Sequence, residues 1–366
     1  MYKDERFARR EMATVVVAMS GGVDSSVAAA MLRDQGYDVI GVNLRLYSKE
    51  DSQAYSLNKQ CCTLDSMRDA EAVCRKLGIP FYALNMEREF TRDVVDYFVS
   101  EYLQGKTPNP CLACNAHIKF HHLFERAMAL GADYIATGHY ARLRRTESGV
   151  KLLTGVDAAK DQSYTLYMLS QRELERTLLP IGEQTKAETR ELARKYGLVT
   201  ANKPESQDIC FIPSGDYRAF VRRLAPHAES PGPIVDTSGR QLGVHHGVAF
   251  YTIGQRKGLG ITVGKPMYVV RLDPEKNMVV VGTKEELSSR EIRLCDVNYI
   301  DGSPRTEAFE CEVKLRYRGA SIPAIVHPED DRSVRVELLG PGNVAPGQAV
   351  VFYQGEEVLG GGKATS

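Results

Sequence analysis

The sequence lacks any apolar run of the length that a membrane-spanning helix needs, and its first residues, MYKDERFARREM, lack the apolar stretch of a secretory signal. Internal repeats and low-complexity tracts are absent as well. Hydrophobic residues make up 43% and charged residues 26% of the 366 residues, as in globular proteins. We therefore expect a cytoplasmic globular protein that has no membrane partner.

The sequence also has no net charge, because 47 basic side chains balance 47 acidic ones. The overall charge therefore neither indicates nor excludes RNA, since a tRNA-binding protein needs only local basic patches. A structural disulfide framework is a poor explanation for eight cysteines in a cytoplasmic chain of this length. Some of these thiols should be buried small side chains, and others should carry chemistry.

Strand-like apolar runs alternate with helical patterns in the first half of the chain, and helices are expected over residues 91–104 and 115–130 and then through about residue 197. This alternation predicts an α/β fold with an open, doubly wound, mostly parallel sheet. Ligands of such sheets bind beyond the carboxyl ends of the strands, in the strand-to-helix loops.

The length of the chain predicts two or three domains. From residue 231 onward the sequence changes to short β-rich runs with turn signals, and its final part alternates without any helical period. This pattern predicts a small antiparallel barrel or sandwich at the C-terminal end. We expect the domain boundaries near residues 210 and 285.

A glycine-rich segment, SGGVDS at residues 20–25, lies between the apolar strand-like run 14–19 and a helical pattern. Two glycines let the backbone approach a ligand closely, and the following helix offers N–H groups and a positive dipole end to phosphate. The segment is not a Walker A loop, because no lysine follows the glycines. Its spacing resembles the SGGxDS loop of the ATP pyrophosphatase superfamily. The alternative is a turn with capping serines that binds no ligand.

A second segment combines a helix start with two cysteines. Asn109 is expected to cap a helix that begins at Pro110, which places Cys111 and Cys114 on one face of its first turn. A helix N-terminus lowers the pKa of a thiol. A CxxC pair also fits a redox pair, half of a zinc site or coincidence, and without a second CxxC a four-cysteine zinc site lacks ligands. Cys210, taken alone, is more simply a buried strand cysteine.

Taken together, the motifs resemble one family closely, the bacterial tRNA-specific 2-thiouridylases. The matching segments run from about residue 15 to 361 and are MSGGVDSSVAA, TPNPCLACNAHIKF, GADYIATGHYAR, KDQSYTLYMLS, SQDICFI, TIGQRKGLG and APGQAVVFY. The resemblance implies three domains: a nucleotide-binding domain with the reactive cysteines (1–210), a small tRNA-contacting central domain (211–285) and a C-terminal β-barrel (286–366).

The resemblance also implies a reaction. ATP with Mg²⁺ would adenylate the C2 oxygen of the wobble uridine of tRNA, which turns that oxygen into a leaving group. Sulfur would arrive from a cysteine desulfurase or a sulfur-relay protein as a persulfide on Cys210. Cys114 would act as the nucleophile that completes the transfer, leaving a disulfide between Cys114 and Cys210.

Binding residues follow from the same resemblance. Those implied for ATP are Ala18, Met19, Ser20, Gly21, Gly22, Val23, Asp24, Ser25, Leu44 and Gly138. Those implied for tRNA are Asn109, Pro110, Cys111, His139, Lys160, Asp161, Gln162, Arg316, Tyr317 and Gln348, with Arg256, Lys257 and Arg318 as further phosphate or stacking contacts. Each of these residues also has a simpler explanation. Leu44 could be a core leucine, His139 a solvent-facing histidine in a capped loop, and residues 160–162 a polar turn. The arginines and lysines could belong to an exposed charged face.

Cys111 departs from the family pattern, which carries an aspartate proposed to assist proton transfer at this position. Three cysteines, Cys111, Cys114 and Cys210, could instead hold a [4Fe–4S] cluster whose fourth iron binds sulfide. Two rival functions remain: a synthetase with the same loop that acts on a small molecule, and a binding module without turnover. No role is assigned to the other cysteines, Cys61, Cys62, Cys74, Cys295 and Cys311.

Overall fold

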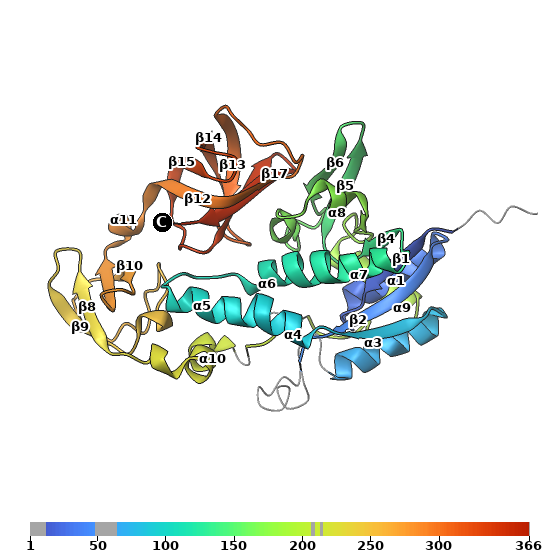
Figure 1. The fold of residues 1–366 in the computed structure, drawn as a ribbon, viewed down its shortest axis with the longest axis horizontal. Helices are drawn as coiled ribbons and strands as arrows, with labels where there is room; N and C mark the ends of the chain where they lie inside the picture. The colour runs from blue at the N-terminus through green and yellow to red at the C-terminus, as the bar shows by residue number, and fades with distance from the viewer. Residues whose placement is uncertain (1–11, 48–63, 206–208, 213–214, 366) are drawn as a thin grey trace, which may run out of the picture.

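The computed structural model describes residues 12–47, 64–205, 209–212 and 215–365, so Cys61 and Cys62 lie outside the described residues. Figure 1 shows an α/β domain at one end, a small β-rich domain at the other, and a barrel above the helices that connect them. No helix in the described part is long and apolar enough to cross a membrane.

The N-terminal sheet is fully parallel, with the order β3-β2-β1-β4-β7. Its strands are β1 (Thr14–Ala18), β2 (Asp38–Arg45), β3 (Phe81–Asn85), β4 (Tyr134–Ala136) and β7 (Thr177–Leu178). In β1, Val15 and Val17 pack with α1 (Val23–Asp34) and α3 (Leu64–Leu77), whereas Val16 faces the opposite core. Because β1 is buried on both faces, its continuous apolar run is explained and the doubly wound α/β fold is confirmed.

Two long helical segments lead away from this sheet. The first runs over residues 87–103 as α4 (Glu87–Phe90), η1 (Thr91–Asp96) and α5 (Tyr97–Leu103). The second runs over residues 110–129 as α6 (Pro110–Ala113), η2 (Cys114–Leu123) and α7 (Phe124–Ala129). Both expected helices are thus confirmed. The first begins one turn earlier than expected, and the second is continuous with the helix start expected at Pro110.

The expectation of helices throughout the segment up to residue 197 is wrong in part. A hairpin of β5 (Ala141–Thr146) and β6 (Gly149–Thr154) follows β4. Beyond it, η3 (Ser163–Leu166) and α8 (Gln171–Glu175) are short, and only α9 (Lys186–Lys195) is a full helix. The hairpin was missed because β5 carries three arginines and because β6 has its second partner, β17, in a distant part of the chain.

The C-terminal part forms a closed antiparallel barrel in the order β12-β15-β14-β13-β16-β17, with β12 also pairing with β17. Its strands are β12 (Ser289–Tyr299), β13 (Phe309–Lys314), β14 (Ser321–Pro328), β15 (Val334–Gly342), β16 (Ala349–Gln354) and β17 (Glu357–Ala364). β17 also pairs with β6 of the α/β domain, through Glu357 opposite Leu153 and Val358 opposite Leu152. The predicted barrel is therefore confirmed, and its sheet extends into the α/β domain.

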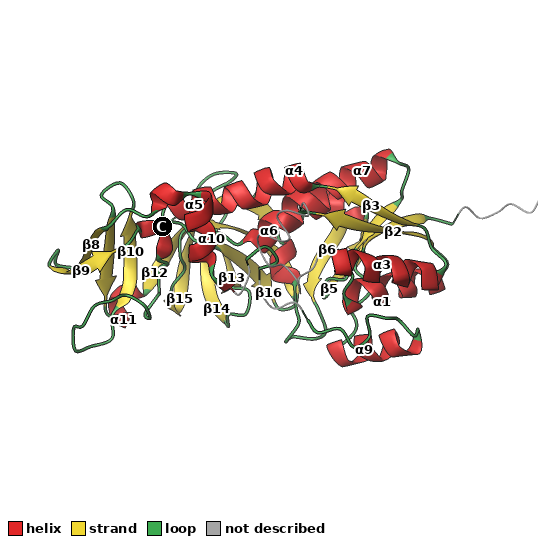
Figure 2. Ribbon diagram, turned by 90° about the horizontal axis from the view of Figure 1, so that it is seen from below, coloured by secondary structure: helices red, strands yellow, loops and turns green. Residues whose placement is uncertain are grey.

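The central domain holds a four-stranded sheet in the order β10-β11-β8-β9. Figure 2 shows β8, β9 and β10 at the end of the molecule away from β2 and β3. Its elements are α10 (Tyr217–Leu224), η5 (Pro226–Ala228), β8 (Gly232–Asp236), β9 (Gln241–His245), η6 (Val248–Phe250), β10 (Tyr268–Asp273), β11 (Met278–Gly282) and α11 (Lys284–Leu287). This sheet shares a hydrophobic core with the long helices, since Phe98 of α5 packs edge-on against Phe220 of α10.

A buried ion pair joins the barrel to the first long helix. Glu101 of α5 has only 8% of its side chain exposed and accepts a hydrogen bond from Lys363 Nζ of β17 at 2.6 Å. Lys106 lies farther from the same carboxylate, at 3.5 Å. Since a buried carboxylate needs a cation, Lys363 is the main electrostatic link at this junction.

Replacing Lys363 with Met should leave Glu101 buried without its close partner and cost about 3 kcal/mol of stability. Thermal unfolding should show a midpoint lower by roughly 5–10 °C. The double variant Glu101→Gln, Lys363→Met is the control, and it should lose clearly less because no buried charge remains. An unchanged midpoint for Lys363→Met would show that this pair does not secure the junction.

Candidate nucleotide and thiol site

The glycine-rich loop leaves β1 and enters α1 at the carboxyl edge of the sheet. Gly21 has a φ of 70°, and a Cβ at this position would overlap the carbonyl oxygen of Ser66 at the start of α3. Gly22 is the N-cap of α1, and no side chain caps this helix. The first N–H groups of α1 therefore point toward the loop without a side-chain oxygen in front of them, as an anion site requires.

The loop serines turn onto the loop itself. Ser26 Oγ donates to the carbonyl oxygen of Gly22 at 2.7 Å, and Ser25 Oγ accepts from the N–H of Ser20 at 3.2 Å. These bonds hold the turn in shape. They also place the Ser20 and Ser25 hydroxyls 3.2 Å apart, on the side where a phosphate would approach.

Asp24 neither caps α1 nor faces a group of carboxylates. Its two carboxylate oxygens accept from Lys186 Nζ at 2.7 and 2.8 Å, and one of them also accepts from the Tyr140 hydroxyl at 2.8 Å. An ammonium group thus occupies the place that a magnesium ion would need, so Asp24 does not form a ready magnesium site in this arrangement.

Two lysines that the sequence motifs did not predict, Lys186 and Lys203, reach the loop. Lys203 Nζ donates to the carbonyl oxygen of Gly21 at 2.9 Å and to Asp69 at 2.6 Å. Glu205 accepts from Lys160 at 2.6 Å and lies 3.5 Å from Lys186. The Lys160 hydrogen bond keeps the pKa of Glu205 below its usual value. No local pattern marks these lysines, because they reach the loop from well over a hundred residues away.

Gly138 follows β4 and touches the first turn of α1. A Cβ on Gly138 would lie 2.6 Å from the backbone nitrogen of Ser25, so only glycine lets the end of β4 come this close. Leu44 and Met19 are both buried, with 7% and 1% of their surfaces exposed. Their expected contact with the nucleotide therefore stays a prediction.

The cysteine helix begins as the sequence predicts. Asn109 is the N-cap, and its Oδ1 accepts from the backbone N–H of Cys111 at 3.1 Å, while Pro110 is the first helical residue. Cys111 is exposed and Cys114 is half-buried. The next residue, Asn115, is buried and donates to the carbonyl oxygen of Thr165 at 3.0 Å. The first turn with both thiols is therefore held in a fixed place.

Cys210 lies in a turn, so its interpretation as a strand residue is wrong. Its half-buried Sγ is 3.2 Å from the hydroxyl of Tyr47, which follows β2. The neighbouring Phe211 is 1% exposed and packs edge-on against Phe90 and Phe98. Aromatic packing next to the thiol, rather than strand pairing, explains the apolar sequence around Cys210.

The three cysteines do not form a ready metal site. Across the described ranges, no three His, Cys, Asp or Glu side chains come together in a group that could hold a metal ion. Cys111, Cys114 and Cys210 are therefore not gathered as three corners of a cluster in this arrangement.

Several residues expected to contact tRNA meet where the cysteine helix touches the barrel. The N–H of Thr107 donates to the carbonyl oxygen of Pro346 at 2.7 Å, and Gln348 Nε2 donates to the carbonyl oxygen of Thr107 at 2.5 Å. Burial raises the pKa of the Tyr317 hydroxyl, and Asp161 and Cys111 lie near enough to raise it further. Barrel residues thus flank the exposed thiol.

Other residues in this set have structural contacts. Asp161 accepts from Lys314 at 3.3 Å, and Gln162 Oε1 accepts from the backbone N–H of Tyr140 at 2.9 Å. His139 is buried and bonded to the Thr137 hydroxyl at 2.6 Å, so the alternative of a solvent-facing histidine is wrong. Burial holds the pKa of His139 well below its usual value, which keeps the ring neutral at pH 7.

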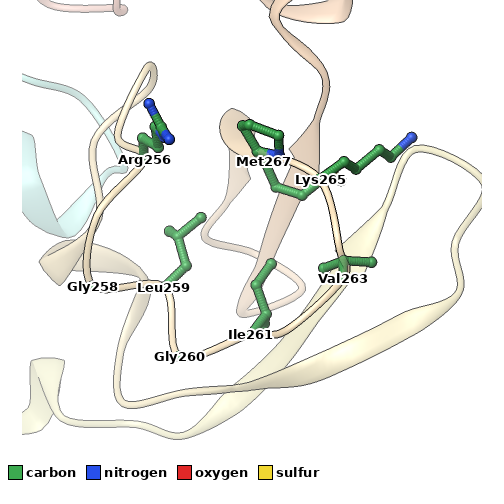
Figure 3. Close-up of a pocket in the computed structure, with 9 residues that line it drawn as sticks. Arg256, Gly258, Leu259, Gly260, Ile261, Val263, Lys265 and Met267 are labelled. Carbon is green, nitrogen blue, oxygen red and sulfur yellow. The ribbon is translucent and has the colours of Figure 1, made fainter.

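Arg256 lies apart from the other candidates, in the central domain. The loop before β10 lines a pocket of about 240 Å³. Figure 3 shows Arg256 and Lys265 on either side of the apolar side chains of Leu259, Ile261 and Met267. Such a pairing of cations with apolar surface suits a nucleotide with its phosphate.

Comparisons with known proteins match most of the chain. Family models match a tRNA methyl transferase HUP domain at residues 13–214, a tRNA methyl transferase PRC-barrel domain at 218–283 and an aminomethyltransferase β-barrel domain at 289–364.

Two relatives are each named tRNA-specific 2-thiouridylase MnmA. The one from Roseiflexus castenholzii is 49% identical and covers 96% of this chain and 99% of its own. The one from Carboxydothermus hydrogenoformans is 50% identical and covers 95% of this chain and 96% of its own. Among solved structures, an NMN synthetase from Francisella tularensis is similar, with 15% identity, a TM-score of 0.34, and coverage of 58% of this chain and 77% of that one.

Replacing Gly21 with Ala should weaken ATP binding by about 10- to 100-fold, because the new Cβ forces the loop away from Ser66 and adds backbone strain. Calorimetric titration with ATP measures this change. Gly36→Ala is the matched control, since Gly36 has a φ of 88° but nothing within 4 Å of its Cβ position. Equal affinities for the two variants would contradict a phosphate-binding role for the loop.

Proposed function

This chain belongs to the tRNA-specific 2-thiouridylases, which are tRNA sulfurtransferases, and we propose that it uses ATP to replace the C2 oxygen of the wobble uridine with sulfur. The observation that carries the proposal is that one chain combines an anion-ready loop at the start of α1 with two half-buried thiols, Cys114 and Cys210. Two of the family models are described by methyl transfer, whereas the loop and the thiols are the groups that ATP activation and sulfur transfer would use.

The first step activates the base. The C2 oxygen of the uridine attacks the α-phosphorus of ATP, the bond to the β-phosphate breaks, and pyrophosphate leaves. The loop supports this step because the N–H groups at the start of α1 and the hydroxyls of Ser20 and Ser25 can take the departing phosphates. Magnesium that accompanies ATP would supply further charge, and Asp24 is the loop's one carboxylate toward it.

The second step delivers sulfur. The outer sulfur of a persulfide on Cys210 attacks C2, and AMP leaves with the former C2 oxygen. Cys114, as a thiolate, then attacks the inner sulfur of Cys210, so a disulfide forms between them and the outer sulfur stays on C2. Both thiols are half-buried, and Cys114 lies in the first turns of a helix, where the dipole favours a thiolate.

The substrate would lie across the domains. The exposed first turn with Cys111 is flanked by Tyr317 and Gln348 of the barrel, and Arg256 offers a separate cationic contact in the central domain. The target base must leave the anticodon stack to reach the thiols. A persulfide-carrying protein, a cysteine desulfurase or a relay protein, would load Cys210, and the reaction would take place in the cytoplasm, where tRNA is present.

Replacing Cys210 or Cys114 with Ser should reduce tRNA thiolation to below about 1% of the unmodified protein, because each thiol has its own step. Release of pyrophosphate from ATP in the presence of tRNA should continue, since activation precedes sulfur transfer. Cys295→Ser, in barrel strand β12, is the control that should keep both activities. If both thiol variants still thiolate, a synthetase chemistry without cysteines is favoured. If the unmodified protein releases no pyrophosphate, it is a binding module.

Iron content separates the persulfide route from the cluster route. Protein purified without oxygen should thiolate tRNA from a persulfide donor with no iron bound. The opposite result is activity that follows about four irons per chain and disappears on chelation. That outcome would make Cys111, Cys114 and Cys210 cluster ligands and would overturn both thiol assignments.

A further inference from the structure

The residues of the nucleotide loop do not include a positive charge that could balance the phosphates of ATP. ATP brings several negative charges, while residues 18–25 supply only N–H groups, hydroxyls and the negative charge of Asp24. Loops of the Walker type meet the phosphates with a lysine, and this loop contains none. Beyond any magnesium that accompanies ATP, only a cation from another part of the fold can meet the phosphates.

Lys186 is the cation placed to do so. Its Nζ lies 2.7 and 2.8 Å from the two carboxylate oxygens of Asp24, and only 12% of its side chain is exposed. Its backbone is fixed, because Lys186 is the first residue of α9, where Thr185 forms a capping box and the Lys186 N–H donates to Asp157 at 2.9 Å. A fixed backbone with a long side chain lets the ammonium move locally without moving the helix.

Lys186 can also leave its present partners at small cost. Glu205 would keep Lys160 at 2.6 Å and Arg190 at 3.8 Å. Asp24 would keep the hydroxyl of Tyr140, whose pKa burial and the nearby Asp24 both raise, so this hydroxyl stays a donor.

The other nearby lysine is less suited to move. Lys203 is the one cation paired with Asp69 among the described ion pairs, and it also donates to the carbonyl oxygen of Gly21. Its departure would release the loop backbone at Gly21 and leave Asp69 without its partner among the described hydrogen bonds, whereas Asp24 would keep the Tyr140 hydroxyl when Lys186 leaves. This difference selects Lys186.

We infer that Lys186 is the phosphate-binding lysine of this site, and that ATP takes its ammonium group from Asp24 when it binds. The inference rests on the proposed use of ATP. In the nucleotide-free protein, Lys186 is bonded to Asp24 beside the loop. When ATP binds, its phosphates compete with Asp24 for the ammonium group of Lys186. Asp24 thereby weakens nucleotide binding as long as no other cation replaces the lysine beside it.

The test is calorimetric titration of the full chain with ATP and with pyrophosphate, both in EDTA so that no metal takes part. Lys186→Met should bind each about 10- to 100-fold more weakly, because a charge-assisted bond to phosphate is lost. Lys186→Arg should recover much of the affinity. Asp24→Asn should bind more tightly than the unmodified protein, since the lysine is then released from its competitor. Adding Lys186→Met to Asp24→Asn should remove that gain.

Lys195→Met is the matched control, because Lys195 is an exposed lysine on the same helix, at its last turn. It should bind both ligands as the unmodified protein does. Equal affinity of Lys186→Met and Lys195→Met, or weaker binding by Asp24→Asn, would overturn the inference. If the unmodified protein binds neither ligand even when magnesium is added, the proposed use of ATP fails instead.

Discussion

The pairing of β6 with β17 constrains the whole molecule, because it makes a hairpin of the α/β domain part of the barrel sheet. Charges reinforce it: Lys151 donates to Glu357 at 2.8 Å, and Arg142 lies 2.9 Å from Glu356. A barrel on a linker would move freely relative to the nucleotide loop. Here the backbone ladder fixes the two domains, so barrel residues can contribute to a site that starts in another domain.

The molecule has two hydrophobic cores: one joins the domains, and the other supports the nucleotide loop. The larger core is continuous from Val16 of the α/β sheet through Phe98 of the long helix to Val279 of the central domain and Val351 of the barrel. The smaller core lies on the other face of the parallel sheet and supports α1, α3 and α9. The nucleotide loop sits on this smaller core, so its partners on α9 can respond to a ligand without disturbing the contacts that join the domains.

The features that the sequence predicted are local ones. The buried strand β1, the loop after it and the helix start at Asn109 each depend on neighbours within a few residues, so their patterns are complete in one stretch of chain. The features it missed are long-range. The pairing of β6 with β17 joins positions some 200 residues apart, and Lys186 meets Asp24 across 162 positions. Cys210 was misassigned because packing against Phe90 and strand pairing select the same apolar residues.

Lys203 and Cys210 are close together in the sequence, and each is bonded to a different part of the proposed site. Lys203 is fixed to the nucleotide loop through Gly21, and Cys210 is fixed near the end of β2 through Tyr47. Lys203 and Cys210 are seven positions apart, and an extended chain spans at most about 3.6 Å per residue, so their Cα atoms lie within about 25 Å of one another. In the proposed reaction, the α-phosphate of ATP and the sulfur of Cys210 act on the same uridine C2. The limit of about 25 Å keeps these two anchors in one region of the molecule, as a shared substrate base requires.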